Sequence, residues 1–332
     1  LFFQAAGMSS AATLPLIDCH PSTGSFRDDV VSGLSRERKQ IPSKYLYDAR
    51  GSKLFDRITG LEEYYPTRTE ASIMHAEIDA IASAIGDDAL MVEYGSGSSD
   101  KTTILLDRLA DDLVGYVPVD ISRDHLMEAA AGIDAAYPSL EVRPVCADYT
   151  SSFPLPDLVE EAMRTVVYFP GSTIGNFEED DAVAFLRRMA RTAGPGGGLL
   201  IGVDLRKDPA ILHAAYNDRE GVTAEFNLNL LRRMNRELDA DFDLDAFRHE
   251  AVWQSDAGCI EMHLVSQKPQ TVRVGDQTFA FDEGESIHTE YSFKFTPEQF
   301  ANMAAEAGFR IEDVWTDDQD LFSIQYATVA AW

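Results

Sequence analysis

The chain has 332 residues, of which 45% are hydrophobic and 25% charged; this composition indicates one large globular domain or two ordinary ones and excludes a disordered chain. Its 56 acidic and 28 basic residues give a formal net charge of −28, which would repel a nucleic-acid backbone and argues against a polynucleotide partner. No apolar run has the length of a membrane span, no signal peptide is recognisable, and the three cysteines show neither metal-site nor disulfide spacing, so we expect a cytoplasmic protein without membrane contact.

Helices and strands alternate along residues 69–206, whereas Leu1–Gly7, which stand before Met8, look like a cloning remnant and are left out of the fold prediction. Helices are expected at 70–85, from 100 onward, at 123–136 and at 179–192. Strands are expected before Gly95, at 116–120, up to 148, at 165–169 and at 199–205. This alternation predicts an α/β fold with a parallel sheet and right-handed crossovers.

The most specific signal in this region is an apolar strand that runs into a turn carrying Gly95 and Gly97 and then into a helix. Glycine at the first βα turn lets the backbone approach a ligand closely. The third glycine of a dinucleotide fingerprint is missing, which disfavours a pyrophosphate. Three strand ends carry polar groups suited to a nucleoside: Glu93, Asp120 for a ribose diol, and Asp148 with Tyr149 for an adenine. The set predicts an S-adenosylmethionine (SAM) site.

After residue 206 the pattern changes. Residues 209–250 are largely helical, and 251–295 alternate as in an antiparallel sheet. A helix opening at Thr296-Pro297 and strands at 311–315 and 322–329 then return to the main sheet. This is the layout of a class I methyltransferase, a Rossmann-like sheet with a second α+β substrate-binding domain. The expected division is 8–68 for the first part of the substrate domain, 69–206 for the SAM-binding domain, 207–293 for the substrate-binding insertion, and 294–332 for the C-terminal part of the methyltransferase domain.

Several longer segments carry a family resemblance. They are Tyr47-Asp-Ala-Arg-Gly-Ser-Lys-Leu-Phe-Asp56, Leu61-Glu-Glu-Tyr-Tyr-Pro-Thr-Arg-Thr-Glu70, Gly171-Ser-Thr-Ile-Gly-Asn176, Gly221-Val-Thr-Ala-Glu-Phe-Asn227 after Tyr216, and Ile260-Glu-Met262. From about Gly33 to Phe322 the chain closely resembles the histidine-specific Nα-methyltransferases that begin ergothioneine biosynthesis. The resemblance implies SAM-dependent trimethylation of the α-amino group of L-histidine, which gives hercynine.

The resemblance also implies roles for individual residues. The cofactor-binding positions match Gly95, Gly97, Lys101, Asp120, Asp148 and Tyr149. The positions around the backbone end of the substrate match Tyr47, Tyr64, Gly171, Asn176 and Tyr216, of which Tyr47 and Asn176 are the candidate catalytic residues. The positions around the substrate side chain match Met262, Glu290 and Ser292.

The residue types fit the implied chemistry. Methyl transfer is an in-line displacement at a sulfonium carbon, so the protein mainly has to hold a neutral amine close to the methyl group, and no metal is required. The amide of Asn176 and the phenol of Tyr47 can orient a nitrogen. Glu290 and Ser292 stand two residues apart on a predicted strand, so they point to the same face and can bind both imidazole nitrogens.

Two alternatives stay open at this point. In the first, the protein is an Nα-methyltransferase of the same fold that acts on another aromatic amino acid such as tryptophan, although Glu290 and Ser292 favour histidine. In the second, the protein is not catalytic: it keeps both sites and senses the amino acid and SAM. We expect a monomer.

Overall fold

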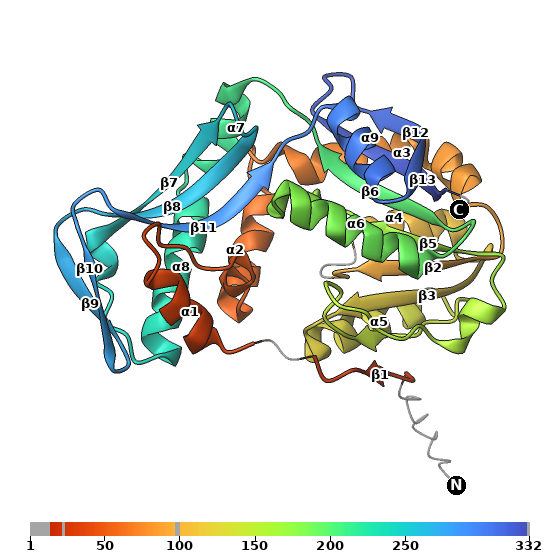
Figure 1. The fold of residues 1–332 in the computed structure, drawn as a ribbon. Helices are drawn as coiled ribbons and strands as arrows, with labels where there is room; N and C mark the ends of the chain where they lie inside the picture. Colours follow the sequence, from red (N-terminus) through yellow and green to blue (C-terminus); the bar gives the residue numbers. More distant parts are fainter. Residues whose placement is uncertain (1–13, 22–23, 97–99, 331–332) are drawn as a thin grey trace, which may run out of the picture.

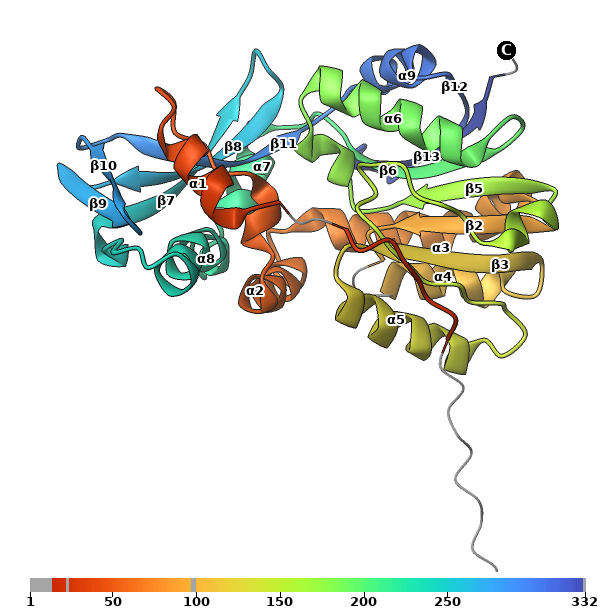
Figure 2. The ribbon, with the colours of Figure 1, turned by 60° about the horizontal axis from the view of Figure 1, so that its bottom comes forward.

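The computed structural model describes residues 14–21, 24–96 and 100–330. Figure 1 shows two units side by side, with a large sheet between helices on the right and a smaller antiparallel sheet with its own helices on the left. Figure 2, turned about the horizontal axis, shows the same separation and shows α3 (Tyr65–Ile85) reaching from one unit into the other.

In the part of the chain that the structure describes, the main sheet has eight strands in the order β1-β4-β3-β2-β5-β6-β13-β12. They are β1 (Ile17–Asp18), β2 (Ala89–Tyr94), β3 (Leu113–Asp120), β4 (Val145–Cys146), β5 (Arg164–Phe169), β6 (Gly198–Asp204), β12 (Phe309–Thr316) and β13 (Phe322–Val329). Neighbours from β1 to β6 are parallel, and β13 runs antiparallel between β6 and β12. The predicted α/β sheet with a closing hairpin is confirmed.

Helices cover both faces of this sheet. They are α3, α4 (Asp100–Leu109), α5 (Arg123–Ala136), α6 (Glu179–Ala193) and α9 (Pro297–Glu306), with short turns η2 (Asp157–Glu160) and η3 (Thr173–Asn176). Alternate residues of β2 show why both faces are apolar: Leu90 and Val92 pack in one core with α6 and α9, whereas Ala89 and Met91 pack in another with α3, α4 and α5.

The second unit is built on the antiparallel order β11-β8-β7. Its elements are α1 (Phe26–Leu34), η1 (Ser43–Leu46), α2 (Ala49–Thr59), α7 (Pro209–Tyr216), α8 (Val222–Glu237), η4 (Leu244–Ala246), β7 (Phe247–Gln254), β8 (Cys259–Ser266), β11 (Ser286–Phe293) and the hairpin of β9 (Gln270–Val274) and β10 (Gln277–Phe281). A third apolar core holds them together.

The end of β11 ties the two units together. Phe295 donates its N–H to the carbonyl of Asp204 at 3.1 Å, and Arg206 donates its N–H to the carbonyl of Phe295 at 3.0 Å. The chain that leaves the small sheet therefore extends the end of β6 in the main sheet. This pairing fixes the C-terminal end of β11 against the edge where parallel strands end, which is where ligands bind in such sheets.

The predicted helices and strands agree with the structure to within a few residues, and the helix at 70–85 begins earlier, at Tyr65, because Pro66 suits its first turn. The two-residue strand β1 was not predicted, since it is too short to show alternation. It pairs with β4, so residues 17–18 lie on the main sheet although the sequence analysis assigns 8–68 to the substrate unit. The domain boundaries stay predictions.

Candidate active site

Four of the residues predicted to bind the cofactor, Gly95, Asp120, Asp148 and Tyr149, lie together at the carboxyl ends of β2, β3 and β4. A Cβ placed on Gly95 would lie 3.6 Å from the ring of Tyr149. Burial, followed by the charges of Asp120 and Asp148, raises the pKa of Tyr149 to about 12. These contacts bring Gly95, Asp120, Asp148 and Tyr149 into one neighbourhood, whereas Gly97 lies outside the described residues.

Local backbone orients each of these groups. Gly95 has φ 74°, a left-handed conformation that favours glycine. The N–H of Ser122 donates to Oδ1 of Asp120 at 2.7 Å, and burial raises the pKa of that carboxyl. The N–H and hydroxyl of Thr150 donate to Oδ1 of Asp148 at 2.9 and 2.6 Å. Two oriented carboxylates, an aromatic ring and a turn without a Cβ fit the hydroxyls, amine and ring of SAM.

Glu93, the third acid expected here, is used inside the protein. Its carboxyl is 2% exposed and accepts hydrogen bonds from the Thr102 hydroxyl at 2.8 Å and from the Tyr116 hydroxyl. Burial raises its pKa to about 7. The expectation of three nucleoside-facing acids is therefore reduced to two.

A residue without a predicted role, Glu70 on α3, links the cofactor edge to the loop after β5. Its carboxylate, 1% exposed, forms an ion pair with Lys101 at 2.5 Å and accepts the N–H of Gly171 at 2.9 Å. Gly202 on β6 makes room for it, since a Cβ there would stand 2.2 Å from the Glu70 oxygen. Lys101 and Gly171, expected on the cofactor and substrate sides respectively, thus share one buried carboxylate.

We expect Glu70→Gln to lower the free energy of unfolding by about 1–3 kcal/mol, because the amide keeps the shape but leaves the Lys101 ammonium without its charged partner. Denaturant titration measures the change. Glu62→Gln is the matched control, since the Glu62 side chain is 88% exposed in its pair with Arg219 and exposed pairs contribute little. Equal effects of the two substitutions would contradict a structural link through Glu70.

The loop that carries Gly171 and Asn176 packs against β11. Gly171 has φ 81° and Ser172 has φ 56°, and the Ser172 hydroxyl accepts the N–H of Asp204 at 2.9 Å. A Cβ on Gly175 would lie 2.7 Å from the carbonyl oxygen of Phe293, so only glycine allows this approach. Asn176, the last residue of η3, is thereby held next to the end of β11.

Three tyrosines expected around the substrate come from separate elements. Tyr47 follows η1, Tyr64 precedes α3, and Tyr216 ends α7; the ring centroids of Tyr64 and Tyr216 are 6.3 Å apart. Solvent reaches 38% of Tyr47, yet burial of its phenol, followed by the acidic groups of Glu290, Tyr216 and Tyr149, raises its pKa well above the ordinary value. Tyr47 therefore lies within electrostatic reach of both Glu290 and the cofactor edge.

The residues expected at the side-chain end share one face of the small sheet. Glu290 is paired in register with Met262, and Ser292 with Ile260, so Glu290 and Ser292 point the same way. Glu290 is 9% exposed and its Oε2 is buried without a hydrogen-bond partner among the described residues. Burial raises its pKa to about 7, against the opposing charge of Lys294. An unpartnered buried carboxylate oxygen is costly and points to a ligand.

Beside Glu290 lies a buried network around Asp204 and Lys294 that the sequence analysis did not predict. Lys294 donates to Oδ2 of Asp204 at 2.8 Å, to the Tyr216 hydroxyl at 2.9 Å and to the Ser292 hydroxyl at 2.7 Å. Although burial alone would lower it, the charge of Asp204 raises the pKa of Lys294. Lys207 forms an ion pair with the other oxygen of Asp204 at 2.5 Å. The sequence signal that could have indicated this network is an acid and a lysine at the ends of two buried strands.

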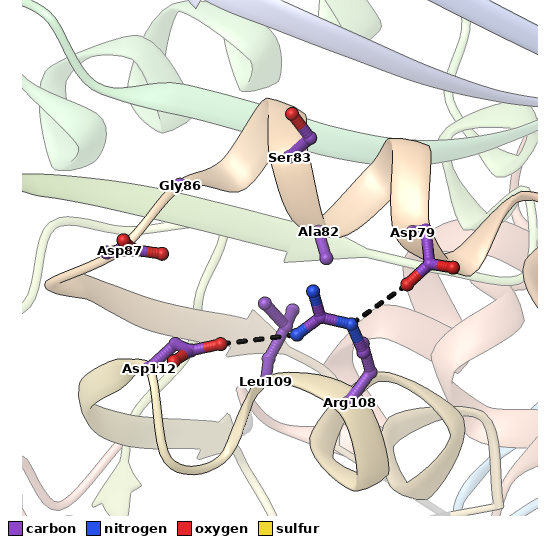
Figure 3. A pocket seen from close by; sticks show the side chains of 8 residues that line it. All are labelled: Asp79, Ala82, Ser83, Gly86, Asp87, Arg108, Leu109 and Asp112. Atoms are coloured by element: carbon purple, nitrogen blue, oxygen red, sulfur yellow. Dashed lines mark hydrogen bonds and ion pairs between the residues drawn. The ribbon is translucent and has the colours of Figure 1, made fainter.

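A hollow of about 380 Å³ lies elsewhere, between α3 and α4. Figure 3 shows Arg108 at its centre, bound to Asp79 at 3.0 Å and to Asp112 at 3.2 Å. It contains none of the predicted site residues. Among the described residues no group of three or more histidines, cysteines or acids is arranged to hold a metal ion. No helix in the described part of the chain is both long enough and apolar enough to pass through a membrane.

The sheet order, with β13 antiparallel between β6 and β12, and the glycine turn followed by two acid-bearing strand ends define a class I SAM-dependent methyltransferase. Residues 26–329 match the family described as histidine-specific, SAM-dependent methyltransferases. The chain belongs to this family, and the predicted resemblance is confirmed.

Named relatives agree with this assignment. The chain is 46% identical over 306 residues to the histidine N-alpha-methyltransferase of Mycolicibacterium smegmatis, covering 91% of this chain and 94% of the relative. It is 44% identical, with the same coverage, to the histidine N-alpha-methyltransferase of Mycobacterium tuberculosis. It is 31% identical to ergothioneine biosynthesis protein 1 of Neurospora crassa over 84% of this chain and 32% of that protein.

Proposed function

We propose that the protein transfers three methyl groups in succession from SAM to the α-nitrogen of L-histidine, giving hercynine in the first step of ergothioneine biosynthesis. The observation that carries the proposal is the buried Oε2 of Glu290, which has no hydrogen-bond partner among the described residues and lies beside the hydroxyls of Ser292 and Tyr216. A neutral imidazole offers one N–H donor and one nitrogen acceptor, which match a carboxylate and a hydroxyl. An indole offers a donor only. Family membership and the names of the relatives support the same substrate.

On this proposal the cofactor lies at the carboxyl edge of the main sheet. Asp120 accepts the ribose hydroxyls, Asp148 and Tyr149 contact the adenine, and the turn of Gly95 and Gly97 with Lys101 holds the remainder of the molecule. When bound, SAM supplies an electrophilic methyl group on its sulfonium sulfur. The contacts of Asp120 with Ser122 and of Lys101 with Glu70 hold these side chains before the ligand arrives, which lowers the cost of binding.

The backbone end of the substrate is held between the units by Tyr47, Tyr64, Gly171, Asn176 and Tyr216. Because the pKa of Tyr47 is raised well above its ordinary value, the phenol keeps its proton at neutral pH and acts as a hydrogen-bonding group. Tyr47 and Asn176 orient the free amine toward the methyl group. Holding two reacting atoms in line can lower the barrier of such a displacement by about 7–11 kcal/mol.

We also propose that the protein acts as a monomer in the cytoplasm. Both sets of site residues come from one chain, so no second copy is needed to complete them. Light scattering after size-exclusion chromatography tests the monomer: a mass of 36.7 kDa is expected, and a dimer would contradict it.

Histidine and SAM should give a product with all three methyl groups on the α-nitrogen and none on the ring, because the imidazole nitrogens are occupied by Glu290 and the Ser292 hydroxyl. Mass spectrometry with fragment assignment measures this. Tryptophan is the comparison substrate in the same assay. Methyl groups on the imidazole, accumulation of monomethylhistidine alone, or faster turnover of tryptophan would each contradict the proposed function.

A further inference from the structure

Lys294 stands directly behind the Ser292 hydroxyl, at the side-chain end of the site, and behind the Tyr216 hydroxyl next to it. It is 2% exposed, and its ammonium group has three protons. Each has an acceptor: Asp204 at 2.8 Å, Tyr216 at 2.9 Å and Ser292 at 2.7 Å. The Asp204 carboxylate keeps the lysine charged, so both hydroxyl oxygens accept a hydrogen bond from a permanent cation.

The remaining hydrogen-bonding capacity of the two hydroxyls can be counted. Together they have two protons and four lone pairs, and Lys294 occupies one lone pair on each oxygen. The oxygens lie 2.7 Å apart, so their mutual hydrogen bond uses one proton and one further lone pair. One proton and one lone pair are left, on different oxygens. If Tyr216 donates to Ser292, the Ser292 oxygen has no free lone pair and its proton must find an acceptor.

We propose that Lys294 is a positioning residue for the side-chain end of the substrate: it occupies one lone pair of the Ser292 oxygen, and with Tyr216 donating to the other lone pair the Ser292 hydroxyl can only donate, which selects the neutral imidazole over the imidazolium. This inference rests on the proposed function. Neutral imidazole donates its N–H to Glu290 and accepts the proton of the Ser292 hydroxyl on its other nitrogen. An imidazolium has no lone pair, so the proton of the Ser292 hydroxyl would stay buried without an acceptor, and an unsatisfied buried donor is costly.

Several titratable groups surround this end of the site and bear on its pH dependence. They are Glu290 on β11, Asp204 on β6 with Lys207 after it, Tyr64 and Tyr65 at the start of α3, Tyr216 on α7 and Tyr47 after η1. Burial raises the pKa of Glu290 to about 7 and lowers that of Lys207 to about 8. A pH profile of histidine alone therefore mixes the ring of the substrate with these two groups.

A ring-fluorinated histidine, whose imidazole stays neutral in mild acid, separates these contributions in the wild-type protein. Both ligands experience the same titration of Glu290 and Lys207, but only histidine gains a ring proton. Between pH 8 and pH 5.5 the KM of histidine should rise about tenfold more than that of the fluorinated analogue, since roughly one ring in ten is still neutral one unit below its pKa. Parallel changes of the two KM values would overturn the inference.

Two lysine variants then test the role of Lys294 itself. Lys294→Met removes the donor to both hydroxyls, whereas Lys207→Met removes the other cation bound to Asp204 without contact to Ser292 or Tyr216. At pH 8 we expect Lys294→Met to raise the KM of histidine roughly 10- to 100-fold and to reduce the discrimination against the ring cation. Lys207→Met should change the KM less than about threefold, and SAM affinity should be kept in both.

The outcomes separate the inference from the function on which it rests. Equal increases of KM in the two variants, or undiminished discrimination in Lys294→Met, would overturn the positioning role. If Lys294→Met does not fold, as thermal unfolding would show, the wild-type comparison still tests whether the site selects the neutral ring, and parallel KM changes of the two ligands would overturn the inference. A wild-type protein that does not turn over histidine would instead overturn the proposed function.

Discussion

Asp120→Ala should weaken SAM binding roughly 10- to 150-fold, because it removes a charged acceptor for two ribose hydroxyls and hydrogen bonds to a charged group contribute about 1.5–3 kcal/mol. The fold should stay intact. Burial raises the pKa of the Asp120 carboxyl, so its ionised form is disfavoured in the folded protein without a ligand, and its loss removes that cost. Calorimetric titration with SAM measures the affinity, and thermal unfolding checks the fold.

Asp124→Ala is the matched control for this experiment. Asp124 lies in the first turn of α5, four residues further on, and its side chain is 96% exposed. It changes the net charge by the same amount without touching the proposed cofactor edge, so SAM affinity should be unchanged. An unchanged dissociation constant for Asp120→Ala would place the cofactor elsewhere.

The cofactor edge could be predicted from sequence because it depends on local signals. Glycine in the turn before a helix, and an acid where an apolar strand ends, are visible in a few consecutive residues. The carboxyl ends of parallel strands then meet at one edge, which brought Gly95, Asp120 and Asp148 together without knowledge of the packing. Glu93 follows the same local pattern, and its inward hydrogen bonds to Thr102 and Tyr116 depend on contacts that no short segment shows.

The linking groups could not be predicted, because each acts through a partner far along the chain. Glu70 meets Gly171 across 101 positions, and Lys294 meets Tyr216 across 78. What the sequence does show is a charged residue in an otherwise apolar segment, which indicates a buried charge. One example is β6, which ends in Asp204 after six buried residues. Isolated buried charges need partners, but the sequence alone does not say which partner the fold supplies.

Glu290→Ala should lower kcat/KM for histidine roughly 100-fold and leave SAM affinity unchanged, because the carboxylate is proposed to bind the imidazole N–H away from the cofactor. Tryptophan should lose less, since its indole cannot use the carboxylate and the hydroxyl together, and the truncated side chain leaves room beside Met262. Relative preference should shift toward other aromatic amino acids. Steady-state kinetics on both substrates, with SAM affinity measured separately, tests the separation.

Glu261→Ala provides the control. Glu261 lies on the neighbouring strand β8, in register with Tyr291 and therefore on the opposite face from Glu290, where it pairs with His263 at 3.0 Å. Its side chain is 13% exposed, so the two substitutions remove similarly buried carboxylates. Histidine turnover should fall much less in this variant. Equal losses, or a parallel loss of SAM affinity in Glu290→Ala, would show that the imidazole subsite is assigned wrongly.

The pH dependence of stability separates a ligand-binding carboxylate from a structural one. Burial raises the pKa of Glu290 from 4.5 to about 7, so the folded protein holds a proton that the unfolded chain releases, and the free energy of unfolding falls as pH rises between these values. Above pH 7 the destabilisation is complete, and below pH 4.5 it is absent. Glu290→Gln should therefore be more stable than the wild type at pH 8, with the gain shrinking as pH falls toward 4.5. Denaturant titrations at pH 8 and pH 5 measure this; a less stable variant at pH 8 would mean that Glu290 serves the fold and not the substrate.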